Sequence, residues 1–107
     1  MFTNFEETKT WEEYAASFPK NSPDTDKLMA AVCYHFEIEK NDTAEVGQIT
    51  KNYFRRARWS HPVNLSATAN YCAGKGWLSE AGREKSRKLW KITKRGYETV
   101  KAKMDQL

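Results

Sequence analysis

The sequence contains little of what marks a secreted or membrane-spanning chain. Two cysteines occur in 107 residues, and no apolar run approaches the roughly 18 residues that a membrane-spanning helix needs. The first residues lack the basic-then-apolar order of a secretory signal. A chain of this length has room for one hydrophobic core, not two. We therefore expect a single globular domain in the cytoplasm.

Groups of residues that carry catalysis or bind metals are also scarce. Cys33 with His35, Cys72 and His61 do not form a zinc-binding spacing, because no C-x-x-C pair occurs. The Gly-Lys-Gly segment 74–76 is too short for a phosphate-binding loop, and no activating context surrounds a nucleophile. We therefore predict no enzymatic activity, no metal and no cofactor. Both cysteines fall on predicted buried stripes, so we interpret them as reduced core thiols, with a disulfide or metal site as the alternative.

Negative charge is scarce in the second half of the chain. Residues 51–107 contain fourteen basic and four acidic residues, a net charge of +10, whereas residues 1–50 contain four basic and ten acidic residues, a net charge of −6. The formal net charge of +4 hides this asymmetry. A basic half in a small domain is typical of a surface that binds a polyanion such as a nucleic acid. The alternative is an ordinary solvated surface on which the two halves offset each other.

Residues 1–23 predict a helical lead-in that is aromatic and acidic. Thr10 and Glu13 form a capping box, T-x-x-E, which opens a short helix that Pro19 ends. This helix has two interpretations: it closes the core of the domain, which we favour, or it provides the interface of a homodimer. The helix carries the aromatic residues Trp11, Tyr14 and Phe18, whereas the homodimer interface would consist of Phe2, Phe5, Trp11 and Tyr14.

Two longer helices are predicted next. Ser22, with Pro23 at the first helical position, predicts an amphipathic helix that runs to about Lys40. Thr43 predicts the cap of a further helix over 44–58, which ends in a basic turn. Gly47 lies inside that helix, where glycine costs about 1 kcal/mol relative to alanine. We therefore interpret Gly47 as a point of close packing against another helix.

A third helix is predicted over 64–75. Asn64 or Ser66 is its expected N-cap, and Leu65, Ala69 and Cys72 have the spacing of one buried stripe. The opposite face carries small or hydrogen-bonding side chains. Two glycines, at 74 and 76, predict where this helix ends.

A β-hairpin and a last helix complete the predicted elements. Segments 77–78 and 88–92 are expected to be the two strands of the hairpin, on either side of a polar, basic loop that contains Gly82. Thr93 then predicts the cap of the last helix. Gly96, near the third position of that helix, is expected to leave room for the hairpin to pack against it.

The order and the junctions of these elements resemble the winged helix-turn-helix superfamily, in its small prokaryotic form, over about 24–104. Three motifs carry the resemblance: P-V-N-L-S at 62–66, G-W-L at 76–78 and I-T-K-R-G at 92–96. The resemblance implies a mainly α fold with a small β-hairpin: a three-helix core plus a wing, with extra N-terminal and C-terminal helices. The domain would span 24–107, after the lead-in of 1–23.

The resemblance also implies a function and a set of contact residues. Helix 64–75 would lie in the major groove of double-stranded DNA, and the wing over 79–88 would contact the phosphate backbone. The protein would then be a transcriptional or mobile-element regulator, associated with the nucleoid. Helix 64–75 contains no arginine and no glutamine, so Asn70 is the residue there suited to pair with an adenine edge. The expected contact residues are Arg55, Arg56, Arg58, Ser66, Ala67, Asn70, Tyr71, Lys75, Arg83, Lys85, Arg87 and Lys88.

A protein-interaction module is the alternative function. Winged helices also serve as docking or assembly units that do not bind DNA, and such a small chain is also compatible with binding to a host complex. The basic half would then meet an acidic protein partner. The arrangement of the cations separates the two hypotheses. A positive strip that joins Arg55, Arg56, Lys75 and residues 83–88 on one side favours DNA, whereas scattered positive charges favour a protein partner.

Overall fold

The computed structural model describes residues 10–19 and 21–104. These residues form five helices and one two-stranded antiparallel sheet, which confirms the expected class of a mainly helical fold with a small hairpin. One of the five helices is continuous through three segments, the middle one a π-helix. The elements are α1 (Trp11–Ala16), α2 (Asp24–Glu37), α3 (Val46–Ile49), η1 (Thr50–Phe54), α4 (Arg55–Ala57), α5 (Leu65–Gly74), β1 (Leu78–Glu84), β2 (Arg87–Ile92) and α6 (Lys94–Met104).

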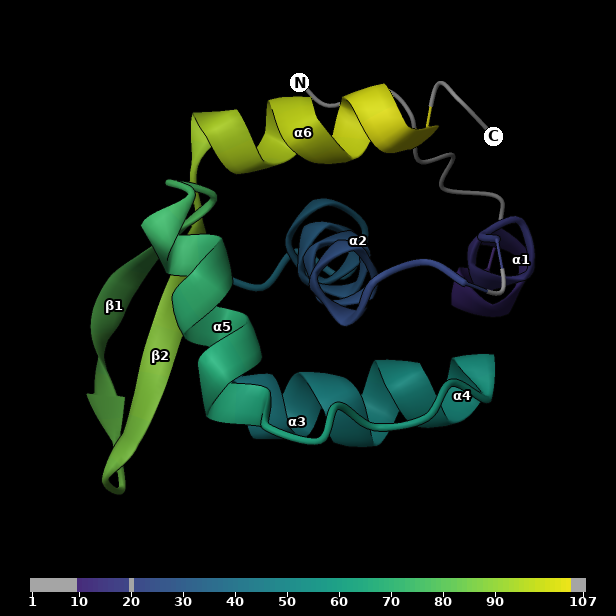
Figure 1. Cartoon of the computed structure of the whole chain (residues 1–107). Helices are drawn as coiled ribbons and strands as arrows, with labels where there is room; N and C mark the ends of the chain where they lie inside the picture. Colours follow the sequence, from purple (N-terminus) through teal and green to yellow (C-terminus); the bar gives the residue numbers. More distant parts are fainter. Residues whose placement is uncertain (1–9, 20, 105–107) are drawn as a thin grey trace.

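Helix α2 lies at the centre of the fold, with the other elements around it. Figure 1 shows α2 nearly end-on, with α6 above it, the α3–α4 helix below it, α1 on one side, and α5 with the hairpin on the other. Seven consecutive residues, from Leu28 to Tyr34, are buried. The prediction of one buried and one solvent-exposed face is therefore wrong for this part of α2, which is buried on all sides. A helix that is covered on every side needs apolar residues all round, not on one stripe.

Both ends of α2 also differ from the prediction. The Ser22 hydroxyl does not cap the helix, because it donates a hydrogen bond to the carbonyl oxygen of Pro19 at 2.8 Å. Pro23 is the N-cap residue and makes no side-chain cap. The helix stops at Glu37 instead of Lys40, whose φ of 58° lies in the left-handed region.

Helix α1 closes the core next to α2, as the favoured interpretation of the lead-in expected. The predicted capping box is present: the Thr10 hydroxyl accepts from the backbone N–H of Glu13, whose side chain accepts from the N–H of Thr10. Trp11 is fully buried, and Tyr14 is 5% exposed. Neither ring is therefore available to a second chain, as the homodimer interpretation would require. Phe2 and Phe5 of that interpretation lie outside the described residues.

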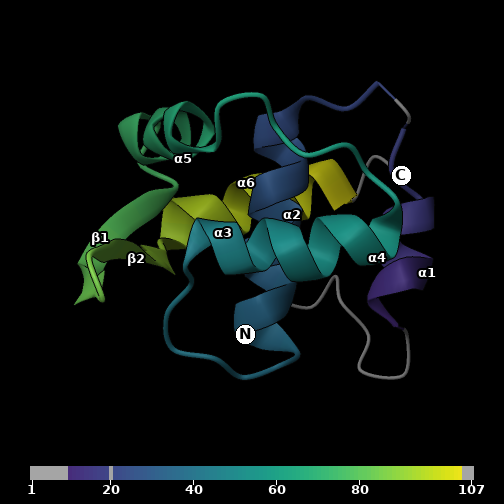
Figure 2. The same cartoon turned by 90° about the horizontal axis from the view of Figure 1, so that it is seen from below.

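The helix from Val46 to Ala57 begins later than predicted. Its N-cap is Glu45, not Thr43, and Ala44 is still extended. Ala44 exchanges two backbone hydrogen bonds with Trp90 of β2, at 2.8 and 2.9 Å. This bridge joins the start of the helix to the hairpin, so the two elements form neighbouring walls. Figure 2 shows the helix passing across α2.

A polar network holds the loop that precedes Ala44. The Nε2 atom of His35 lies 3.2 Å from the carbonyl oxygen of Thr43, which can only accept, so Nε2 carries the proton. The Tyr53 hydroxyl has one proton and two acceptors within reach, Nδ1 of His35 at 2.9 Å and a carboxylate oxygen of Glu39. Burial lowers the pKa of His35. The network thus connects α2 and η1 to the loop just before the Ala44–Trp90 bridge.

Helix α5 begins and ends as predicted. The side chain of Asn64 accepts a hydrogen bond from the N–H of Ala67 at 3.0 Å, which identifies it as the N-cap. At the other end, the N–H groups of Gly76 and Trp77 donate to the carbonyl oxygens of Ala73 and Cys72, at 2.9 and 3.0 Å. Gly76 has a φ of 79°. This pair of hydrogen bonds around a left-handed glycine is the Schellman motif.

The hairpin turns at a different place from the one expected. Its two-residue turn is Lys85–Ser86, and both residues have positive φ, 49° and 67°, as a type I′ turn requires. Gly82 is not in the loop. It lies within β1, next to a β-bulge where the register shifts between Glu80 and Gly82, and has a φ of 113°.

The start of α6 is fastened to the junction between α5 and β1. The Thr93 hydroxyl accepts from the N–H of Gly96 at 3.0 Å and donates to the carbonyl oxygen of Gly76 at 2.5 Å, which confirms Thr93 as the cap. A Cβ at Gly96 would lie 2.3 Å from the carbonyl oxygen of Trp77 and 2.8 Å from the side chain of Ile92. The predicted role of Gly96, to let the hairpin pack against the helix, is confirmed.

Candidate nucleic-acid interface

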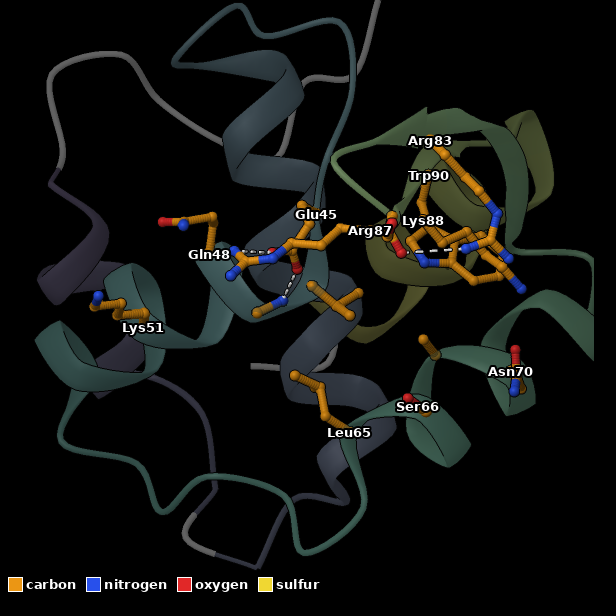
Figure 3. Close-up of a pocket in the computed structure, with 14 residues that line it drawn as sticks. Glu45, Gln48, Lys51, Leu65, Ser66, Asn70, Arg83, Arg87, Lys88 and Trp90 are labelled. Carbon is orange, nitrogen blue, oxygen red and sulfur yellow. Dashed lines mark hydrogen bonds and ion pairs between the residues drawn. The ribbon is translucent and has the colours of Figure 1, made fainter.

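A groove with a volume of about 710 Å³ lies between three elements. One wall is the start of the α3 helix, the second is α5, and the third is the β1–β2 hairpin (Figure 3). The Ala44–Trp90 bridge holds the first and third walls together. The lining residues are Glu45, Val46, Gly47, Gln48, Lys51, Leu65, Ser66, Ala69, Asn70, Arg83, Ser86, Arg87, Lys88 and Trp90.

The groove is positively charged. Four of its lining residues are cations: Lys51 on the first wall, and Arg83, Arg87 and Lys88 on the hairpin. Glu45 supplies the single carboxylate among these lining residues. An excess of three positive charges in a concave surface concentrates the positive potential there and attracts a polyanion.

Helix α5 presents a face of small and polar side chains to solvent. Its buried side holds Ala69 and Cys72, 2% and 0% exposed, while Leu65 is half-buried. The helix has ten residues and is therefore about 15 Å long. Its exposed face consists of Ser66, Ala67, Asn70, Tyr71 and Gly74.

The hairpin extends from the body and carries its cations close to its tip. Arg83 Nη1 donates a hydrogen bond to the carbonyl oxygen of Ser86 at 3.2 Å, which braces the turn. The Lys88 ammonium lies 5.2 Å from the centre of the Trp90 ring and 4.0 Å from a carboxylate oxygen of Glu80. Because Trp90 is buried and its backbone pairs with Ala44, the base of the hairpin is a fixed platform for these side chains.

The structure brings together five of the twelve contact residues expected from the sequence. These five come from two elements, α5 and the hairpin, whose facing surfaces make two walls of the groove. They are Ser66, Asn70, Arg83, Arg87 and Lys88.

The three arginines at the end of the α4 segment do not join this group. They lie beside α1, across the molecule from the hairpin (Figure 1). Arg56 Nη2 is 3.0 Å from a carboxylate oxygen of Glu12, and its guanidinium lies over the Tyr53 ring. The hydrogen bond from Arg56 holds the pKa of Glu12 below its usual range. The predicted positive strip therefore does not run from Arg55 and Arg56 to the hairpin. These arginines lie beside α1, where Arg56 pairs with Glu12.

The remaining predicted residues are exposed but lie outside the groove. Tyr71 is 52% exposed, and the Lys75 ammonium lies 5.4 Å from its ring centre, so these two form a patch at the C-terminal end of α5 with Trp77. Ala67 lies on the exposed face of α5. Lys85 is in the hairpin turn, on the side of a second hollow that also includes His35 and Thr43.

Sequence reasoning missed nine of the fourteen lining residues, among them three polar ones on the first wall, Glu45, Gln48 and Lys51. Gln48 and Lys51 are three positions apart, so they share one face of a helix whose buried side holds Ile49 and Tyr53. That spacing was readable from the sequence. Glu45 was not recognisable as a lining residue, because its position depends on where the helix begins.

The cysteines lie in the core, as expected. Cys33 and Cys72 are free and fully buried. Burial raises the pKa of the Cys72 thiol to about 12, so the reactive thiolate is disfavoured. Over residues 10–19 and 21–104, no group of three or more His, Cys, Asp or Glu side chains is placed to hold a metal ion. Within the same residues no helix is both long and apolar enough to cross a bilayer.

Comparisons with known proteins give no relative for this chain. No family model matches its sequence, and no curated protein and no solved structure matches it either. Any assignment therefore depends on the geometry and charge of the groove.

Proposed function

We propose that this chain is a DNA-binding protein of the winged helix-turn-helix class. In this proposal α5 lies in the major groove and the β1–β2 hairpin contacts the phosphate backbone. The observation that carries the proposal is the groove itself, where four cations from two walls face a helix with a small, polar surface. Phosphate contacts of this kind supply most of the affinity of a DNA-binding protein.

The order of the elements supports the class. Helices α2, α3–α4 and α5 come first, then the hairpin, then α6. The Ala44–Trp90 bridge adds a third short extended segment to the hairpin, ahead of the second helix of the three. The three motifs of the resemblance occupy the N-cap of α5, its Schellman end and the cap of α6. The motifs therefore form the start and the end of α5 and the start of α6, which set how α5 and the hairpin face each other.

The proposed roles follow from the chemistry of each side chain. Lys51, Arg83, Arg87 and Lys88 would contact phosphates, and Asn70 would read an adenine edge with its amide. Ser66 would contact a base or a phosphate. Since α5 carries neither arginine nor glutamine, we expect a preference at few base positions and most of the affinity to come from phosphate contacts. A protein that acts by occupying DNA fits a regulator of transcription or of a mobile element.

The proposal is tested by measuring how binding to duplex DNA depends on salt. Four neutralised phosphates predict that log K falls against log salt with a slope of roughly −3.6. Fluorescence anisotropy with a labelled random 20-base-pair duplex, over a salt series, gives this slope. A slope near zero, or no binding at low salt, would remove the proposal.

Asn70 provides a second, separate test. Asn70→Ala should leave binding to random duplex nearly unchanged and should weaken binding to a selected site at one base position, by about 1–3 kcal/mol. Sites selected in vitro by the wild-type chain and by the variant are compared. If both proteins select the same bases, Asn70 does not read DNA.

A protein-interaction module is the second candidate, favoured by one observation. Tyr71, beside Trp77 and Lys75, is an exposed aromatic ring of a type enriched in protein interfaces. It lies outside the groove. Tyr71→Ala should abolish binding to such a partner without changing the salt slope for DNA, whereas changes of the groove cations should do the reverse.

A further inference from the structure

The carboxylate of Glu45 lies inside the positive groove. Its Oε1 atom is 3.2 Å from Nη1 of Arg87, on the hairpin wall (Figure 3). Its Oε2 atom accepts a hydrogen bond from the N–H of Gly47. The Glu45 side chain is 16% exposed, whereas that of Arg87 is 64% exposed. A carboxylate on one wall of the groove thus pairs with a guanidinium on the neighbouring wall.

The position of Glu45 depends on a glycine. A Cβ at residue 47 would lie 2.8 Å from Oε2 and 3.1 Å from Oε1 of Glu45. Gly47 therefore leaves the space into which the carboxylate folds back over the helix start. The expected packing of Gly47 against another helix is wrong, since its close neighbour is this side chain. Glutamate is also not among the preferred N-cap residues, which are Ser, Thr, Asp and Asn.

A carboxylate and a phosphodiester offer the same group to a guanidinium. Each presents two oxygen atoms that share a negative charge, at a spacing that arginine binds with two parallel N–H groups. Arg87 cannot give its best geometry to both at once. Because most of its side chain is exposed, a DNA strand in the groove can reach it without opening the core.

We propose that Glu45 is an internal competitor for the DNA backbone, which a phosphate displaces from Arg87 when DNA binds. This inference rests on the proposed function. The Glu45–Arg87 pair weakens binding to any duplex, because every complex breaks the pair. It therefore lowers the affinity for every duplex alike and leaves the contacts of Asn70 with bases unchanged.

The variant that isolates the charge is Glu45→Gln. Glutamine keeps the carbonyl oxygen that accepts from the N–H of Gly47, so the helix start is retained, and it removes the anion that holds Arg87. We expect Glu45→Gln to bind random duplex about fivefold more tightly, a modest gain because Arg87 is 64% exposed and solvent screens its pair with Glu45. The matched control is Glu98→Gln, an equal charge change on the exposed side of α6, outside the groove. It should change affinity less than twofold.

A double-mutant cycle with Arg87→Ala separates competition from plain repulsion. If Glu45 acts by holding Arg87, the gain from Glu45→Gln disappears in the Arg87→Ala background. If its carboxylate merely repels phosphate, the gain stays as large or grows, because no arginine then offsets the charge. Arg87→Ala should also make the salt slope shallower by about 1.

The outcomes distinguish this inference from the proposed function. No gain from Glu45→Gln, or an equal gain with and without Arg87, overturns the competitor role while wild-type binding to duplex still stands. If the wild-type chain does not bind duplex DNA, the proposed function fails first. Should Glu45→Gln not fold, as judged by its circular dichroism and melting, Glu45→Asp replaces it. Aspartate is a preferred cap, and its carboxylate lies about 1.5 Å, one C–C bond, further back from Arg87. A partial gain that depends on Arg87 supports the inference, and no gain overturns it.

Discussion

The indole N–H of Trp11 donates a hydrogen bond to the backbone carbonyl oxygen of Tyr53 at 2.7 Å, across 42 residues of sequence. Both side chains are fully buried, and their rings meet edge to face at 5.4 Å. The acceptor lies in the π-helical segment η1, where the backbone hydrogen bonds are shifted by one residue. This contact fastens the lead-in helix to the helix that forms one wall of the groove.

Trp11→Phe should destabilise the fold by about 1–3 kcal/mol, because it leaves the Tyr53 carbonyl oxygen buried without this donor. Urea unfolding followed by circular dichroism measures the change. Tyr71→Phe is the control, since it also removes one polar atom from an aromatic ring, but from a ring that is 52% exposed. It should change stability by less than about 0.5 kcal/mol. Equal effects of the two variants would contradict a structural role for the Trp11 contact.

Two glycine-to-alanine changes should have opposite effects. Gly96→Ala places a Cβ 2.3 Å from the carbonyl oxygen of Trp77 and should destabilise the fold by about 1–3 kcal/mol. Gly74→Ala meets nothing within 4 Å at the last position of α5 and should stabilise it by about 0.4–1 kcal/mol. Melting temperatures of both variants test the pair. A stable Gly96→Ala variant would show that the hairpin does not pack as described.

Stability should fall when the pH is lowered below about 6.5, the usual pKa of histidine. Burial lowers the pKa of His35 in the folded chain, so the unfolded chain takes up the proton first as the pH decreases. The contribution of His35 is therefore complete above pH 6.5 and decreases below it, until the folded chain is protonated too. Urea unfolding between pH 5 and 8 measures this.

Two substitutions identify the group responsible for the pH effect. His35→Gln should flatten the pH dependence, because glutamine has no proton to take up in this range, although it lowers stability throughout. Ser79→Ala, a change of an exposed residue without a titratable group, should leave the pH dependence as it is. A steep dependence that survives His35→Gln would assign the effect to other groups.

Two single cations, one inside the groove and one outside it, should contribute unequally to DNA binding. Lys88→Ala should weaken binding to random duplex about threefold to tenfold, whereas Arg56→Ala should change it less than about twofold. Both variants remove one positive charge, so the overall charge is matched. Arg56 already pairs with Glu12 on the far side of the molecule. Equal losses in anisotropy titrations would mean that net charge, not the groove, governs binding.

The sequence by itself determined the elements and several of their ends. The capping box at Thr10, the N-cap Asn64, the glycine stop at Gly76 and the cap Thr93 were all readable. Each is a hydrogen bond or a backbone conformation among neighbouring residues, which depends on few other parts of the chain. The glycine at 96 was readable for a similar reason, since it follows a cap at a fixed spacing.

Only the tertiary structure decided which of the charged residues meet. Glu12 and Arg56 are 44 residues apart in sequence, and Glu45 and Arg87 are 42 apart. Whether an arginine faces a groove or a carboxylate depends on how the helices pack around α2, and no local pattern records this. The burial of α2 on every side and the late start of α3 have the same origin, since backbone pairing with Trp90 outweighs the local preference of Thr43 to cap a helix. Long-range packing and pairing, not local propensity, therefore set the charge of the candidate interface.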